Sequence, residues 1–256
     1  MIHRLRIPLL YTLLFLIYVL FSYSFLGDWI YSSIGSLLII FLSFLIWGNG
    51  FLEKIGLQLN LQTLAKSIIL VVIIAGFSIF ILKYIGNKND IRIEYYNWRD
   101  YYHVMFYVLN EEIVLGAILL FTLVYKWKVR PLVASICLAV GFALIHYVFY
   151  RWVFADRGAL GISTLITLLL VGFVRNSLIL HTGHIGYSWA LHFGWIAIMF
   201  GSRHTYLNTN MYVSELESFN IYLGSTEMLV LSIVLAGIFL AYWIKKYNPH
   251  KVRIQY

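Results

Sequence analysis

The 256-residue chain is poor in cysteine, proline and charge. Its single cysteine, Cys137, excludes an intrachain disulfide and is too few for a cysteine-ligated metal cluster. The only prolines are Pro8, Pro131 and Pro249, and none interrupts the centre of an apolar segment. Charged residues make up 12% of the chain and hydrophobic residues 61%. A soluble domain has a large polar surface and rarely falls this low in charge, so the composition excludes that class.

Apolar segments of roughly 20 residues recur along the chain, and each is long enough to cross a hydrocarbon layer of about 30 Å. We therefore predict an all-α, polytopic transmembrane helix bundle of about eight spans, forming a single membrane domain over residues 1–256. The predicted spans are 8–26, 29–47, 65–85, 103–124, 131–151, 159–180, 184–202 and 225–244. The first is read as a retained helix rather than a signal peptide, because its apolar run continues past Ser22-Tyr23-Ser24. Two longer polar loops remain, 87–100 and 203–226.

Basic residues orient the predicted bundle. With the N-terminus in the cytoplasm, 12 Lys and Arg fall in the inside segments and 7 in the outside segments. That count places Arg175 inside, as an anchor at the end of the sixth span. Glu53 is the only acid inside, whereas eight acids lie outside. We expect an integral protein of the bacterial cytoplasmic membrane with both termini cytoplasmic. Its net charge of +8 is expected to anchor it to the headgroups of the lipid bilayer, and we expect no nucleic-acid partner.

Two acids lie outside every predicted loop: Glu111 and Glu112, near the middle of the fourth span. A carboxylate at that depth costs several kcal/mol unless it faces a polar cavity, is paired or is protonated. Neighbouring residues on an α-helix point about 100° apart, so we expect one to face the cavity and the other to pair with a neighbouring helix.

Two histidines are the other candidate site residues, His146 in the fifth span and His192 in the seventh. Each alone is as well explained by a hydrogen-bonded helix contact. Together with the glutamates they place ionisable groups on three nearby spans, which a bundle can bring to one cavity. A carboxylate beside imidazoles suits water activation, with a base for the proton and donors for the oxyanion. His181 and His184 are expected at the membrane interface.

These residues resemble the CPBP family (CAAX prenyl protease and bacteriocin-processing, also called Abi) of intramembrane proteases. The family has Glu-Glu-x-x-x-Arg in one span, Phe-x-x-x-His in the next and a later His-x-x-x-Asn or Asp. The matching segments here are Glu111-Glu112-Ile-Val-Leu-Gly116, Phe142-Ala-Leu-Ile-His146 and His192-Phe-Gly-Trp-Ile196. The resemblance covers a core of about residues 104–200. Order and spacing agree, but Gly116 replaces the arginine and Ile196 replaces the amide or carboxylate.

The resemblance implies a glutamate-type intramembrane endopeptidase acting on a membrane-associated protein or peptide. Glu111 would be the general base, supported by Glu112, while His146 would position the water and His192 would stabilise the oxyanion. Asn110 and Ser188 are candidates for the missing oxyanion donor. We expect no cofactor; zinc at the Glu/His cluster is the minor alternative, because no H-E-x-x-H helix supplies a local chelate.

Two other functions stay open. The departures at Gly116 and Ile196 fit a non-catalytic family member acting in bacteriocin immunity or as a membrane partner protein. Intramembrane Glu and His also serve as proton relays, which would fit a proton-coupled carrier. Carriers commonly show internal repeats and broken spans, and neither is evident in this sequence.

Overall fold

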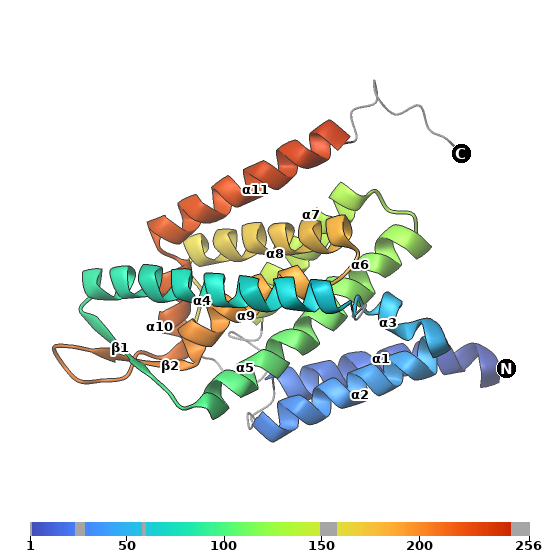
Figure 1. Ribbon diagram of the computed structural model, residues 1–256, viewed down its shortest axis with the longest axis horizontal. Helices are drawn as coiled ribbons and strands as arrows, with labels where there is room; N and C mark the ends of the chain where they lie inside the picture. Colours follow the sequence, from blue (N-terminus) through green and yellow to red (C-terminus); the bar gives the residue numbers. More distant parts are fainter. Residues whose placement is uncertain (1, 24–28, 58–59, 149–157, 247–256) are drawn as a thin grey trace.

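The computed structural model describes residues 2–23, 29–57, 60–148 and 158–246, and nearly all of them are helical (Figure 1). The long helices are α1 (Ile2–Tyr23), α2 (Trp29–Trp47), α4 (Leu61–Lys88), α5 (Trp98–Glu111), α7 (Pro131–Val148), α8 (Ile162–Thr182), α9 (Gly186–Phe200) and α11 (Thr226–Lys246). The short segments are η1 (Gly48–Gly50), α3 (Phe51–Lys54), η2 (Glu112–Ile118), α6 (Leu119–Phe121), η3 (Thr122–Lys126), α10 (Glu215–Ser218) and η5 (Phe219–Leu223). The all-α prediction is confirmed.

Six helical segments in the described part of the chain are long and apolar enough to cross a membrane, which indicates an integral membrane protein. They are Ile30–Lys54, Leu61–Lys88, Trp98–Lys126, Pro131–Val148, Ile162–Thr182 and Thr226–Lys246. The other two predicted spans correspond to α1 and α9. Helix α9 has 15 residues, so it is about 22 Å long at 1.5 Å per residue. That length is shorter than the hydrocarbon layer.

The segment from α5 through η3 is the centre of the bundle. In the most apolar stretch of this segment 72% of the residues are buried, compared with 17% in α4 and 22% in α11. Helix α5 packs on α2 and α9, while the pairs α4–α9, α7–α8 and α8–α11 form the other main contacts. Without a hydrophobic force between helices in lipid, packing depends on close approach of small residues. Gly172 provides this between α8 and α7: a Cβ there would lie 3.3 Å from Ala139 Cα.

Hydrogen bonds fasten α2 to α5. Ser36 Oγ donates to Asn110 Oδ1 at 2.6 Å, and Asn110 Nδ2 donates to the Ser32 carbonyl at 3.3 Å. Ser32 Oγ also lies 2.9 Å from His103 Nδ1. In an apolar environment an unpaired amide or hydroxyl would cost several kcal/mol, so these polar groups fix how the two helices pack.

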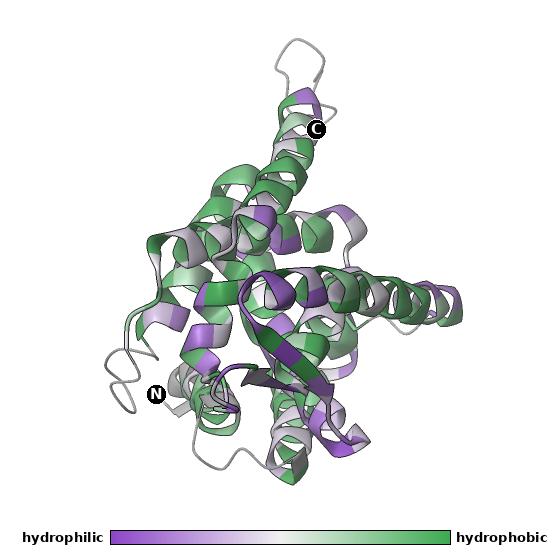
Figure 2. Ribbon diagram, turned by 90° about the vertical axis from the view of Figure 1, so that its left-hand side faces the viewer, coloured by the Kyte–Doolittle hydropathy of each residue, from purple (hydrophilic) through white to green (hydrophobic). Residues whose placement is uncertain are grey.

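The two ends of the bundle differ in charge. Helix α1 begins and α11 ends at the same end, where α3 and the η3–α7 connection also lie (Figure 1). The basic residues of that end are Lys54, Lys126, Lys128, Arg130, Lys245 and Lys246. The opposite end holds a two-stranded antiparallel sheet, β1 (Ile91–Tyr95) with β2 (Ser202–Tyr206). Figure 2 looks at this end and shows hydrophilic residues along the strands.

The sheet joins the two segments that the sequence predicted as loops. Ile91 pairs with Tyr206 and Tyr95 with Ser202, and the Leu207 amide donates to the Asp90 carbonyl at 2.8 Å. The loop prediction was wrong for residues 91–95 and 203–206, and Ser202, predicted as the end of the seventh span, begins β2. Strand pairing across more than a hundred residues leaves little local signal.

A buried histidine lies in this sheet. His204 Nδ1 in β2 and the Tyr222 hydroxyl in η5 share a hydrogen bond of 2.6 Å, and both side chains are buried. Burial lowers the pKa of His204 from 6.5 to about 4, and burial also raises the pKa of Tyr222. Burial therefore favours the neutral imidazole at this contact.

We predict that acid weakens this end of the fold. The folded-state pKa of His204 lies below the value of 6.5 expected in the unfolded chain. The contribution of this residue to the free energy of unfolding is therefore complete above pH 6.5 and is lost as the pH falls towards 4. The linked loss at pH 4.5 is about 2 kcal/mol. His204→Gln, whose amide accepts from Tyr222 but takes up no proton, should show a smaller drop in Tm between pH 7 and pH 4.5 in detergent. The exposed His181→Gln should retain the wild-type drop; an equal drop in His204→Gln would contradict the assignment.

Candidate active site

Glu111 and Glu112 lie at a change of helix type in the middle of the bundle. Helix α5 ends at Glu111, and the π-helical segment η2 begins at Glu112. Both side chains are 0% exposed. Wide π-turns are rare and occur frequently at functional sites. The sequence thus places two carboxylates, side by side, in the most buried part of the protein.

Arg175 of α8 binds both carboxylates. Its Nη1 lies 3.3 Å from Glu111 Oε1 and 3.8 Å from Glu112 Oε1, and the side chain is 4% exposed. The guanidinium carbon also lies 4.3 Å from the centre of the Phe142 ring. The interpretation of Arg175 as an interfacial anchor was wrong. The sequence carried a signal, since Arg175, Asn176 and Ser177 form a polar run inside an apolar span.

The expectation that the two glutamates face different places was also wrong in part. Glu112 does contact a neighbouring helix, through His192, but both Oε1 atoms lie within 4 Å of the same Arg175 nitrogen. The 100° separation describes a regular α-helix, whereas the second residue here starts a π-helical segment. A long cationic side chain reaching between them then contacts both.

The two predicted histidines join this cluster. His192 Nδ1 of α9 lies 2.9 Å from Glu112 Oε1, so a protonated Nδ1 donates to the carboxylate. His146 Nδ1 of α7 donates to the Phe142 carbonyl at 2.7 Å. The Phe142 ring lies beside both imidazoles, with centroid distances of 4.6 Å to His146 and 6.1 Å to His192. In each histidine Nε2 is the nitrogen left for chemistry.

Three polar atoms of the cluster are buried without a hydrogen-bond partner: Glu111 Oε2, Glu112 Oε2 and Arg175 Nε. Buried polar atoms are nearly always paired in native proteins, and unpaired ones gather where water, an ion or substrate binds. The unpaired oxygens of Glu111 and Glu112 can therefore each accept a hydrogen bond from a bound water molecule or ligand.

Gly116 lies where η2 packs against α8, the helix that carries Arg175. A Cβ on Gly116 would lie 2.8 Å from Ile179 Cδ1 and 3.2 Å from Glu112 Oε2, so η2 packs directly against α8. A side chain at position 116 would require Ile179 and Glu112 to shift. The positive charge beside the glutamates comes from Arg175 of α8 instead.

The CPBP pattern has a polar residue at the position of Ile196. Among the described residues no other side chain supplies that polar group, in contrast to Arg175 and the charge absent at position 116. Ile196 is buried in an apolar cluster with Val104, Val108 and Ala197, between α9 and α5. Asn110 bonds to Ser32 and Ser36 of α2, so it is not the oxyanion donor that the sequence allowed. The other candidate, Ser188, donates to the Ile185 carbonyl at 2.9 Å while lying next to Glu112.

The cluster does not fit a zinc ion. No three His, Cys, Asp or Glu side chains among the described residues converge in a way that could hold a metal. The Oε1 atoms of Glu111 and Glu112 are bound by a guanidinium, which occupies the cationic position that a metal would take.

Arg175→Gln is predicted to destabilise the protein by about 3–5 kcal/mol, because it leaves buried carboxylates without a counter-charge. The triple variant Arg175→Gln/Glu111→Gln/Glu112→Gln removes both charges and should recover most of the loss. The measurement is Tm in detergent, compared between the three proteins.

An exposed ion pair gives the control. Arg92 Nη2 lies 2.6 Å from Glu94 Oε1, with the side chains 56% and 41% exposed. Arg92→Gln should change stability by about 1 kcal/mol at most. An Arg175→Gln protein as stable as Arg92→Gln would show that the buried charges are not held by Arg175.

Comparison with known proteins adds no relative. No family model matches the chain, and neither a curated protein nor a solved structure matches it. The geometry of Glu111, Glu112, His146, His192 and Arg175 therefore carries the functional argument.

Proposed function

We propose that this protein is a glutamate-type intramembrane endopeptidase, similar to the CPBP proteases, which hydrolyses a peptide bond of a membrane-associated protein or peptide. One observation carries the proposal: Glu111 has a free, fully buried carboxylate oxygen in a cluster with two histidines and an arginine. A purely structural ion pair needs no imidazoles around it, and apolar residues would fill the space at lower cost.

In the proposed reaction Glu111 Oε2 removes a proton from water, and the water oxygen attacks the carbonyl carbon of the substrate. His146 Nε2 orients that water, since its Nδ1 is held by the Phe142 carbonyl. His192 in its imidazolium form donates from Nε2 to the oxyanion, with Glu112 fixing the ring through Nδ1. The C–N bond then breaks, and Glu111 returns the proton to the leaving amine nitrogen.

Charge balance supports this assignment. Two carboxylates share one guanidinium, so a second positive charge or a proton must offset the remaining negative charge in the buried cluster. His192, 2.9 Å from Glu112, supplies it when protonated.

The membrane topology proposed with this function has eight crossings, with α1 and α9 inside the bilayer and both termini cytoplasmic. Support comes from Figure 1, where α1 begins and α11 ends at one end of the bundle. That end carries Lys126, Lys245 and Lys246, whereas at the other end Glu94 and Glu227 pair with Arg92 and Lys88. Basic residues concentrate on the cytoplasmic side of membrane proteins.

A non-catalytic partner or immunity protein is the second candidate. Ile196 favours it, because an apolar side chain stands where an oxyanion donor would assist His192. In that case the same cluster would only hold α5, α8 and α9 together.

Glu111→Gln is predicted to abolish turnover while preserving the fold. The amide still accepts from Arg175 but cannot remove a proton from water, and loss of a general base costs about 10²–10⁴-fold in rate. Because the substrate is unidentified, the measurement compares membrane-protein fragments from cells producing wild-type or Glu111→Gln protein.

The matched control is Glu53→Gln on α3, an exposed glutamate outside the cluster, which should yield the wild-type fragments. Purified Glu111→Gln must also keep its detergent Tm within a few degrees. Identical fragments from all three strains would exclude the peptidase and favour the partner protein.

A further inference from the structure

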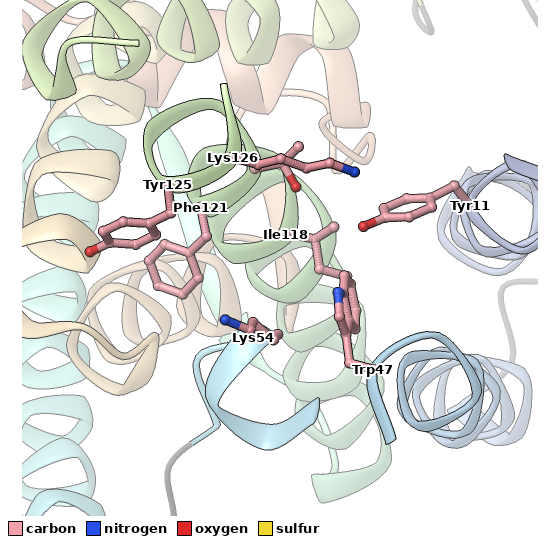
Figure 3. Close-up of a pocket in the computed structure, with 8 residues that line it drawn as sticks. Tyr11, Trp47, Lys54, Ile118, Phe121, Tyr125 and Lys126 are labelled. Atoms are coloured by element: carbon pink, nitrogen blue, oxygen red, sulfur yellow. The ribbon is translucent and has the colours of Figure 1, made fainter. Parts of the chain in front are cut away.

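A second feature, independent of the proposed function, lies at the basic end of the bundle. There a cavity of about 240 Å³ separates the α1–α2 hairpin from η3 (Figure 3). The residues that line it are Tyr11, Trp47, Lys54, Ile118, Phe121, Thr122, Tyr125 and Lys126. They come from α1, α2, α3 and the central segment that begins at the catalytic glutamates.

The cavity is positively charged. Lys54 and Lys126 both line it, and no acidic residue does. Neither lysine forms an ion pair within the described part of the chain, and both are exposed. Two ammonium groups without an acidic neighbour give the cavity a positive potential, which attracts an anion.

The inner part of the cavity is apolar and aromatic. Ile118 and Phe121 are buried, and Tyr11 meets Trp47 edge to face at a centroid distance of 5.7 Å. In Figure 3 the Tyr11 hydroxyl points into the space between Ile118 and Lys126. The ligand that fits is therefore amphipathic: an anionic group for the lysines, a hydrogen-bond acceptor for Tyr11 and an apolar portion.

The position of the cavity decides between a lipid and a soluble anion. It lies at the end of the bundle that collects the basic residues, where aromatic and basic side chains meet lipid headgroups. Tyr125, which lines the cavity, is 58% exposed, so an aromatic ring borders the surface beside the two lysines. Basic pockets between helices on the cytoplasmic side are the kind of site that binds anionic headgroups.

We propose that this cavity binds the phosphate headgroup of an anionic phospholipid, held by Lys54, Lys126 and Tyr11. The bound lipid connects the α1–α2 hairpin to η3. It thereby stabilises the packing of the N-terminal hairpin on the segment that carries Glu111 and Glu112.

The test uses the full-length protein purified in dodecyl maltoside. Tm and lipid adducts in native mass spectrometry are measured with added phosphatidylglycerol, phosphatidylcholine or inorganic phosphate. Phosphatidylglycerol should raise Tm by several degrees and bind more tightly than phosphatidylcholine. Lys54→Gln/Lys126→Gln should weaken phosphatidylglycerol binding roughly tenfold or more, since each basic residue near an anionic headgroup contributes to binding. Each single variant should show part of that loss.

The control variant Lys66→Gln/Lys128→Gln removes the same charge from exposed lysines that do not line the cavity, and it should bind as wild type. Three outcomes would overturn the proposal: equal binding of the two lipids, wild-type binding by Lys54→Gln/Lys126→Gln, or equal stabilisation by inorganic phosphate, which would identify a soluble anion. None depends on peptidase activity, so this proposal and the proposed function fail separately.

Discussion

The contact of Arg175 with Glu111 and Glu112 is the interaction on which the rest of the structure depends. In a bundle bounded by lipid, two adjacent buried carboxylates are tolerated only with a counter-charge, and the guanidinium supplies it at 3.3 and 3.8 Å. That requirement fixes the depth of α8 against α5. It also places His192 of α9, which bonds to the other side of Glu112. Three helices, α5, α8 and α9, are thereby positioned by one charged group and its partners.

Close helix packing is what allows this contact. Gly116 brings η2 against Ile179 of α8, and Gly172 brings α8 against α7. A larger side chain at position 172 would press on the backbone of α7 and separate it from α8, the helix that carries Arg175. The π-helical turn that begins at Glu112 contributes in the same way, since it brings two consecutive acids to one cation. Small residues and an irregular helix therefore serve the electrostatics of the site.

Much of the fold was predictable because apolar length is a strong signal: the predicted spans at 131–151 and 225–244 correspond to Pro131–Val148 and Thr226–Lys246. The contact between Glu112 and His192 was predictable because an ionisable group in the hydrocarbon layer needs a polar partner, and few other polar groups lie at that depth. Arg175 was missed because counting basic residues by loop assigned it to an interface. The π-helix and the β1–β2 pairing were missed because neither has a reliable local pattern; strand pairing depends on a contact far away in sequence.

The structure changes the meaning of the two departures from the CPBP pattern. Position 116 holds glycine where the CPBP pattern has arginine, but Arg175 supplies a positive charge from another helix, so the proposed general base has a counter-charge. Position 196 loses a polar group, and Ile196 packs into an apolar cluster instead. Oxyanion stabilisation then rests on His192, and loss of one such donor costs about 10²–10³-fold in rate. A peptidase built this way would be slow unless its substrate supplies a hydrogen-bond donor, which favours a specific membrane-bound substrate over general proteolysis.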